Sequence, residues 1–251
     1  MALDVRILGP VRVERDGATA KLVNQARAVL AVFVLRHGSP VSADQLIDML
    51  WTGSPPRSAR THVQGLVSML RRTLCTGPGP GAPRTIETEP TGYVLRLKPA
   101  ELDLHRFRHA ITSAEYYRRE GRVTEAVRAY ASALDLWSGV PCEGVEQPTV
   151  RHLTEPLVQV HADALENWAE LALDTGESAC IAAHLHQVVR QHPFRERLRA
   201  LLMTALHHAG RTGEALILYE EGRRLLADEL GIDPSPSLQG LHERLLRGGT
   251  P

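Results

Sequence analysis

The sequence predicts an α+β domain followed by an all-α domain, and three observations lead to this division. Strand-like alternation of apolar and polar residues is confined to the first 97 residues. After Asp103, a short phrase built on Gly, Glu and Ala recurs between helical patterns. The charge is divided in the same way, since residues 1–97 hold 12 Lys and Arg against 7 Asp and Glu, whereas the remainder holds 17 against 22. A basic half beside an acidic half indicates that only the first half contacts nucleic acid.

Two short strands and a helix are expected at the start of the first domain. Asp4–Leu8 and Val11–Glu14 each alternate apolar and polar residues, and the turn residues Gly9-Pro10 separate them. Asn24–His37 carries apolar residues on most of its sides, which is typical of a largely buried helix.

Two further helices are expected next. Ser42–Trp51 begins with Ser42 and Gln45 at the spacing of a capping box, in which each side chain bonds the other residue's backbone N–H. The third helix is expected over Ser54–Leu74, with Ser54 as its N-cap and Pro55 in its first turn.

A loop and a hairpin complete the first domain. Gly77–Pro83 is rich in Gly and Pro and predicts a loop. Arg84–Leu97 alternates apolar residues after the turn signals Pro90 and Gly92, which is typical of a β-hairpin. Strands, three helices and a hairpin in this order predict a winged helix-turn-helix.

The third predicted helix has two incompatible faces. At about 100° per residue, its apolar residues fall within one arc, and the opposite arc holds four cations, three neutral hydrogen-bonding groups and no acid. The apolar set is Ala59, Val63, Leu66, Val67, Leu70 and Leu74, and the polar set is Arg57, Arg60, Thr61, Gln64, Ser68, Arg71 and Arg72. An exposed face without acids repels itself and therefore indicates a polyanionic partner, although a merely solvated basic face is the alternative.

The second domain contains an internal repeat. Gly121–Ala126 with Tyr130 returns as Gly210–Ala215 with Tyr219, and Gly176-Glu177 is a weaker middle copy. Glycine permits a tight turn between two helices, small Ala lets them approach, and Pro193 stands where a second helix would end. These features predict a tetratricopeptide-like helical array, and an unrelated helical bundle is the alternative.

Motifs spread over nearly the whole chain carry a family resemblance. The N-terminal ones are Ile7-Leu8-Gly9-Pro10, Leu46 to Trp51, Pro55-Pro56, Ala59-Arg60, Leu70-Arg71-Arg72 with Leu74, Gly92-Tyr93 and Asp103-Leu104-His105-Arg106-Phe107. The C-terminal ones are His192-Pro193-Phe194-Arg195-Glu196, Leu202-Met203, Gly210-Arg211, Glu214-Ala215, Glu229-Leu230-Gly231-Ile232-Asp233-Pro234 and Leu241-His242-Glu243-Arg244-Leu245-Leu246. With these motifs the chain resembles the Streptomyces antibiotic regulatory protein (SARP) family, in which an OmpR-type winged helix precedes a bacterial transcriptional activator domain.

The resemblance implies a transcriptional activator of a secondary-metabolite (antibiotic) gene cluster. Such proteins bind direct repeats of double-stranded promoter DNA, as protomers arranged head to tail, and recruit the RNA polymerase holoenzyme. The third helix is expected to read the major groove while the wing follows the adjacent backbone. The nucleotide-binding and repeat domains of larger relatives are not found, so the chain resembles the small, pathway-specific members. A homodimer on DNA is therefore the expected assembly.

Site residues follow from the two-faced helix and this resemblance. Four central residues are expected to read bases, because Arg pairs with guanine and Gln with adenine: Arg60, Thr61, Gln64 and Ser68. Five residues are candidates for phosphate contacts: Arg27, Trp51, Arg57, Arg71 and Arg72. Trp51 has an equal alternative as a core aromatic, and the Arg27 contact is in doubt because Asn24-Gln25 precedes it where relatives usually have Pro-Lys. Thr91 and Gly92 form the expected wing tip, beside the acidic Glu87 and Glu89.

No enzyme, cofactor or metal site is predicted. The twelve histidines include no HExxH, no GxSxG is present, and neither lysine completes a phosphate-binding loop. The second alternative to a DNA-binding activator is a helical-repeat regulator that binds proteins or senses a ligand and holds DNA only weakly.

The remaining expectations concern domain boundaries and location. We expect a DNA-binding domain over residues 1–97, a junction at Lys98–Glu101, a helical domain over residues 102–247 and a tail over residues 248–251. The three cysteines show no CxxC spacing, and no apolar run reaches the length of about 20 residues that spans a bilayer. The sequence thus predicts a cytoplasmic, nucleoid-associated protein without membrane contact.

Overall fold

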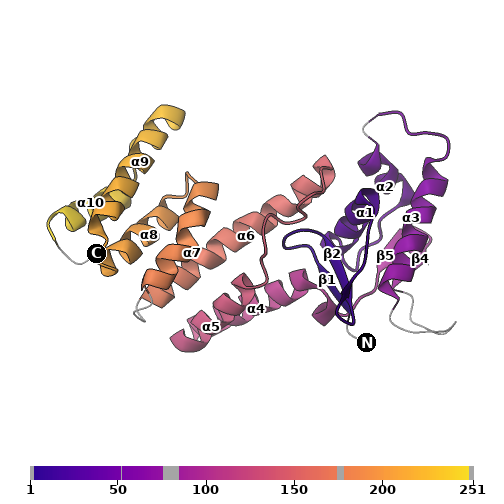
Figure 1. Ribbon diagram of the computed structural model, residues 1–251, viewed down its shortest axis with the longest axis horizontal. Coiled ribbons are helices and arrows are strands. Elements are labelled where there is room, and N and C mark those ends of the chain that lie inside the picture. The colour runs from indigo at the N-terminus through magenta and orange to yellow at the C-terminus, as the bar shows by residue number, and fades with distance from the viewer. Residues whose placement is uncertain (1–2, 52, 76–84, 174–177, 249–251) are drawn as a thin grey trace. The chain divides into compact units, whose positions relative to one another are not determined.

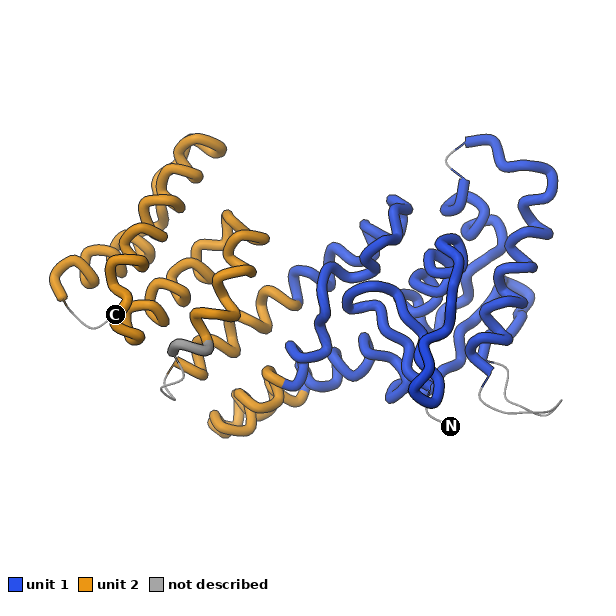
Figure 2. Tube along the Cα trace, viewed as in Figure 1, with its two compact units in different colours: residues 1–112, 132–160 blue, residues 113–131, 161–251 orange. Residues whose placement is uncertain are grey.

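The computed structural model describes the chain except for residues 1–2, 52, 76–84, 174–177 and 249–251, and Figure 1 shows its elements. It divides into two compact units. The first consists of residues 1–112 and 132–160, and the second of residues 113–131 and 161–251 (Figure 2). The α+β and all-α classes predicted for the two halves are confirmed.

The first unit begins with a three-stranded antiparallel sheet in the order β1-β2-β3. Strand β1 covers Leu3–Arg6, β2 covers Arg12–Arg15 and β3 covers Ala18–Thr19. The first two strands are as predicted, within two residues at each end. The short β3 was not predicted, although Asp16 and Gly17 carry the signal for it, since both have positive φ in the turn that joins β2 to β3.

Three helices follow as predicted, with one correction. Helix α1 covers Asn24–Leu35, and α2 covers Ala43–Leu50 behind the expected capping box of Ser42 and Gln45. Helix α3 covers Ala59–Leu74, so the predicted start at Ser54, with Pro55 in the first turn, is wrong. A proline disfavours the helical conformation for the residue before it, so Pro56 opposes a helix at Pro55, and a turn at Arg57 and Ser58 precedes the helix instead.

The predicted hairpin is present. Strand β4 covers Ile86–Glu89 and pairs in antiparallel register with β5, Gly92–Leu95. Tyr93 of β5 exchanges both backbone hydrogen bonds with Val41, each at 2.9 Å, and this bridge ties the hairpin to the segment before α2. The predicted loop at Gly77–Pro83 lies outside the described residues.

Residues after 97 take part in the core of the first unit. The 3-10 turn η1 covers Pro99–Glu101, and parts of three helices contribute: α4, Asp103–Arg119; α5, Val123–Leu134; and α6, Pro148–Leu173. Buried Leu102, Leu104 and Phe107 pack in one cluster with the sheet and with α1 to α3.

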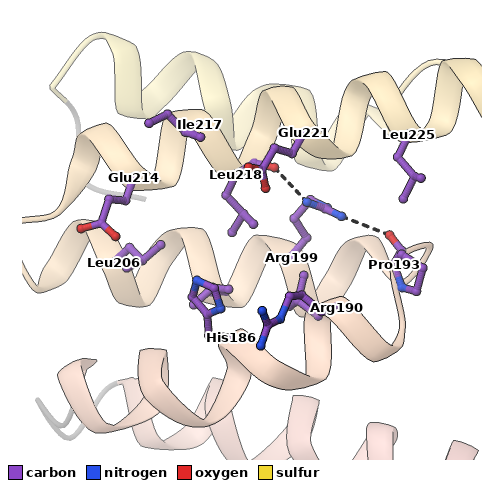
Figure 3. A pocket seen from close by; sticks show the side chains of 12 residues that line it. His186, Arg190, Pro193, Arg199, Leu206, Glu214, Ile217, Leu218, Glu221 and Leu225 are labelled. Atoms are coloured by element: carbon purple, nitrogen blue, oxygen red, sulfur yellow. Dashed lines mark hydrogen bonds between the residues drawn. The ribbon is translucent and has the colours of Figure 1, made fainter.

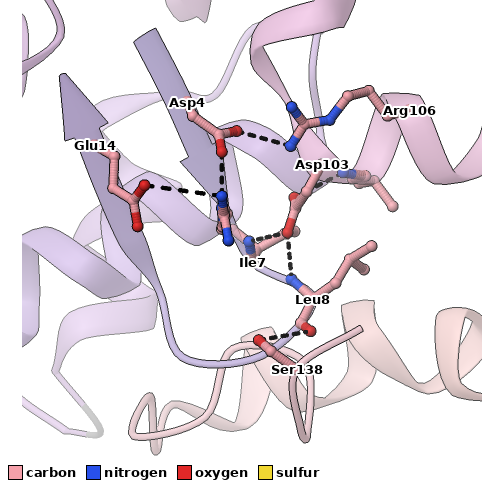
Figure 4. Close-up of polar contacts among 9 residues, drawn as sticks. Asp4, Ile7, Leu8, Glu14, Asp103, Arg106 and Ser138 are labelled. Carbon is pink, nitrogen blue, oxygen red and sulfur yellow. Dashed lines mark hydrogen bonds and ion pairs between the residues drawn. The ribbon is translucent and has the colours of Figure 1, made fainter. Parts of the chain in front are cut away.

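Asp103 connects this later segment to the end of β1 (Figure 4). Its buried carboxylate accepts the backbone N–H groups of Ile7 and Leu8, both at 2.8 Å, and that of Leu104 at 2.7 Å. Burial raises the pKa of Asp103, and the three N–H donors oppose that shift. The two compact units thus divide the chain differently from the predicted domains. The predicted domain boundaries at residues 97 and 102 remain a prediction.

Helices alone make up the described part of the second unit. It contains α7, Ser178–Gln191; α8, Glu196–His208; α9, Thr212–Leu230; and α10, Pro236–Leu246, besides the outer parts of α4, α5 and α6. Helix α7 ends two residues before Pro193, as predicted.

The repeated segment forms the turn between two consecutive helices in both described copies. Gly121 and Gly210 adopt positive φ of 70° and 76° between α4 and α5 and between α8 and α9, respectively. The following arginine pairs with the glutamate three residues later, Arg122 with Glu125 at 2.8 Å and Arg211 with Glu214 at 2.6 Å. The Ala and Tyr of each copy are buried. The tetratricopeptide-like prediction is confirmed, while the middle copy at Gly176-Glu177 lies outside the described residues.

Candidate nucleic-acid interface

Helix α3 has the two faces that the sequence predicts. Its buried residues are Ala59, Val63, Leu66, Val67, Leu70 and Leu74, the same six that were assigned to the apolar arc. They pack against α1 and α2 and join the core of the first unit, except for Ala59. This packing fixes the helix and turns its polar side toward solvent.

The predicted base-reading face, defined as Arg60, Thr61, Gln64 and Ser68 and called the base-reading face below, is exposed at all four residues. The side chains of Gln64 and Ser68 have no hydrogen-bond partner among the described residues. Their donors and acceptors are therefore available to a ligand, and this is the arrangement that reading of base edges requires.

Arg60 is the exception on this face, because it has an acidic partner. Its Nη2 lies 2.6 Å from Oδ1 of Asp44 in the first turn of α2. Both side chains are largely exposed, at 62% and 72%. This pair is not predictable from the sequence, since the two residues lie on different helices and no local pattern connects them.

Arg71 holds the wing to α3. Its Nε donates to the carbonyl oxygen of Ile86 at 2.8 Å, and its Nη2 donates to Oγ1 of Thr88 at 2.7 Å. The guanidinium also lies over the ring of Tyr93, 6.0 Å from its centre. The predicted phosphate role of Arg71 remains a prediction, and the structure gives it a bracing role that the sequence did not suggest.

The other arginines of the face have different surroundings. Arg57 is exposed in the turn that precedes α3. Arg72 is exposed and borders a shallow hollow with Arg15, Thr19 and Thr73, beside the β2–β3 hairpin. Both remain candidates for phosphate contacts.

The two candidates on α1 and at the end of α2 are partly buried. Trp51 packs against the core and meets the ring of His62 edge to face at 5.6 Å, which agrees with its alternative reading as a core aromatic. Arg27 lies on α1, and its buried Nε has no hydrogen-bond partner among the described residues. Gln25, one of the two residues that depart from the family pattern, bonds His62 at 2.7 Å and so connects α1 to α3.

At the wing tip, Thr91 is exposed and Gly92 has a structural duty. A Cβ on Gly92 would overlap the backbone of Val41, where the hairpin meets the start of α2. The acidic side of the wing is partly neutralised by Arg96, which lies 3.1 Å from Glu87 and 2.7 Å from Glu89. The hydrogen bond to Glu87 raises the pKa of Arg96. The wing therefore presents less negative charge than its two glutamates suggested.

A second concave surface lies in the other unit, among α7, α8 and α9 (Figure 3). This groove of about 680 Å³ has an apolar floor that includes Leu202, Leu206 and Leu218. Arg199, only 5% exposed, donates to the carbonyl oxygens of Leu218 at 2.9 Å and Pro193 at 3.2 Å. Desolvation lowers the pKa of Arg199. The two carbonyl bonds fasten α8 to α9 and to the turn after α7, so this arginine has a structural task in the groove.

The described residues offer neither a metal site nor a membrane-spanning helix. They contain no group of three or more His, Cys, Asp or Glu side chains arranged to hold a metal ion. None of the described helices is both long enough and apolar enough to cross a membrane.

Comparisons with known proteins agree with this geometry. Residues 17–95 match the family described as transcriptional regulatory protein, C terminal, and residues 102–246 match the bacterial transcriptional activator domain. Neither family is catalytic.

The curated relatives are transcriptional regulators. The regulatory protein AfsR of Streptomyces coelicolor is 40% identical over 98% of this chain, which spans about a quarter (24%) of AfsR. The regulatory protein DnrI of Streptomyces peucetius is 30% identical over 98% of this chain and 92% of its own length.

One solved structure shares the fold across both units. The structure of Mycobacterium tuberculosis EmbR in complex with a low affinity phosphopeptide matches with a TM-score of 0.85 and 34% sequence identity. The match covers 98% of this chain and 65% of that one.

Proposed function

This chain belongs to the SARP family of transcriptional regulators, and we propose that it activates a secondary-metabolite gene cluster by binding direct repeats in promoter DNA. The observation that carries the proposal is the acid-free exposed face of α3, held rigidly by six buried residues on its other side. A helix of 16 residues extends about 24 Å, enough to lie in a major groove.

Different residues of this surface contact bases and phosphates. Gln64, Arg60 and their neighbours on the base-reading face meet base edges, which carry sequence information. Arg57 and Arg72, at the two ends of the face, contact phosphates and supply affinity that falls with added salt. Arg71 contributes in part indirectly, by holding the β4–β5 hairpin against α3 through its hydrogen bonds to Ile86 and Thr88.

The helical residues after 102 supply the activating function. In this proposal they contact the RNA polymerase holoenzyme and join two protomers on adjacent repeats. The groove among α7, α8 and α9 supports this role, because a concave surface with an apolar floor is suited to docking a partner. The same groove favours the second candidate function, a regulator in which protein or ligand binding dominates and DNA binding is weak.

Footprinting tests the two candidates against each other. Purified protein is incubated with DNA from its own genomic neighbourhood at moderate salt, and nuclease protection is mapped. Protection of paired direct repeats upstream of a promoter supports the activator. An absence of protection, together with capture of polymerase by the full-length protein, would favour the second candidate. The proposed activity requires the protein to act in the cytoplasm at the nucleoid.

A further inference from the structure

The ion pair between Asp44 and Arg60 stands at the edge of the base-reading face. A carboxylate this close to DNA repels phosphates, so it lowers affinity for every sequence. Its contribution to folding is modest, because ion pairs between exposed side chains add little and a carboxylate in the first turn of a helix interacts only weakly with the helix dipole. Non-specific affinity does not account for an acid at this position, and stability accounts for it only in part.

The geometry gives the acid a different use. Asp44 sits on a fixed backbone, since the capping box of Ser42 and Gln45 closes the start of α2 and the next residue, Leu46, is fully buried. Its single contact at 2.6 Å occupies one of the five N–H donors of Arg60 and leaves four. Reading guanine needs two donors side by side in a fixed plane, and a long arginine otherwise samples many rotamers.

We infer that Asp44 is a positioning residue that orients Arg60 for pairing with one base, so that it contributes sequence discrimination at the expense of general affinity. This inference rests on the proposed function, because it requires α3 to read DNA. It predicts opposite changes in two measurable quantities when the acid is removed. Non-specific affinity stays equal or rises, while discrimination at one base pair falls.

The chain offers a matched control for the loss of charge. Asp48 lies one turn later on α2, is also exposed, and has no ion-pair partner among the described residues. D48N therefore removes the same charge from the same helix without touching Arg60. Any difference between D44N and D48N reports the contact with Arg60 and not the charge alone.

The experiment uses full-length wild type, D44N, D48N, R60A and the double variant D44N/R60A. Each selects duplexes from a randomised pool, and the bound fraction is sequenced. The selected duplex, its single-base variants and a scrambled duplex are then titrated at several salt concentrations.

We expect R60A to lose discrimination at one base pair, and D44N to lose about tenfold at the same pair. D48N should keep full discrimination there, and D44N/R60A should discriminate no worse than R60A alone. D44N should bind scrambled DNA at least as tightly as wild type.

Two results would overturn the inference while leaving the proposed function intact: equal discrimination by D44N and D48N, or a D44N loss at a pair that R60A does not affect. A wild type that selects no sequence from the pool would overturn the proposed function as well. Thermal unfolding of D44N checks that the fold persists, and a midpoint slightly below that of D48N is expected, because Asp44 lies in the first turn of α2, where the helix dipole favours a negative charge.

Discussion

At the scale of single residues, the central and terminal positions on the exposed face of α3 should behave differently. We expect Gln64→Ala to relax base preference at one position and to cost about 1–3 kcal/mol of specific binding. Arg72→Ala should instead weaken binding to all sequences and lower the salt slope by about one, because it removes a phosphate contact.

Titrations against single-base variants and scrambled DNA at several salt concentrations separate the two effects. Equal losses for Gln64→Ala on specific and scrambled DNA would contradict its assignment to base reading. Ser68→Ala, on the same exposed face, provides a comparison for loss of a smaller polar group.

Asp103 gives a prediction about stability and pH. Burial raises its pKa in the folded protein above the unfolded value of 3.8, so the folded state binds more protons just above that pH. The contribution of this group to unfolding free energy is therefore largest below the unfolded pKa and decreases as the pH rises through the folded pKa. The asparagine of Asp103→Asn does not titrate. The variant's loss of unfolding free energy relative to wild type should therefore shrink as the pH rises from the unfolded pKa through the folded pKa.

The deficit itself should be about 1–3 kcal/mol, because the amide loses one of the two acceptors that serve Ile7, Leu8 and Leu104. Urea unfolding of both proteins between pH 4 and pH 7 measures it. A deficit that grows with pH would contradict the direction assigned to the Asp103 pKa.

At the scale of elements, two glycines predict opposite effects of the same substitution. Gly92→Ala should destabilise the protein by about 3 kcal/mol or more, because φ is 148° there and the new Cβ would meet the backbone of Val41. Gly65→Ala should stabilise it by up to about 1 kcal/mol, since Gly65 lies inside α3 with nothing within 4 Å of the added carbon.

Thermal and denaturant unfolding of the two variants check this pair. A stabilised Gly92→Ala would show that the hairpin can shift away from the segment before α2. A destabilised Gly65→Ala would show that an exposed part of α3 is more constrained than its surroundings indicate.

The elements also show how far the sequence reaches. Periodicity along one helix predicted all six buried residues of α3, because side chains on one face of a helix repeat at known spacing. The capping box and the repeated Gly-Arg turn were equally local, since their partners lie three residues apart.

Contacts between different elements could not be predicted from such local patterns. Arg71 with the hairpin, Arg96 with two glutamates and Arg60 with Asp44 each join segments whose approach depends on the packed fold. The start of α3 differs from the prediction for a local reason: Pro55 favours a first helical turn, but Pro56 disfavours the helical conformation of Pro55. For the candidate site, the sequence therefore predicted which side chains of α3 face away from the core, but not which of them are already engaged by other residues.

At the scale of the whole molecule, the first compact unit extends beyond the predicted DNA-binding domain. Residues 102–107 supply Asp103 and buried Leu102, Leu104 and Phe107 to its core. The segment after α5 is also hydrogen-bonded to the residues that follow β1. The backbone N–H groups of Ser138 and Cys142 donate to the carbonyl oxygens of Leu8 and Ile7, respectively, each at 2.8 Å.

We therefore expect a fragment of residues 1–97 to be much less stable than one of residues 1–160. The shorter fragment exposes apolar core surface to water, which costs about 25 cal/mol of stability per Å². It also removes the Asp103 carboxylate that accepts the buried N–H groups of Ile7 and Leu8. Thermal unfolding followed by circular dichroism should show a cooperative transition for residues 1–160 and a broad or absent one for residues 1–97. A cooperative transition at the same midpoint for both fragments would contradict this, and would mean that the winged helix folds without the residues that complete its core here. Since α3 can hold its polar face toward DNA only while its apolar face stays packed, DNA binding by the two fragments should follow the same order as their stability.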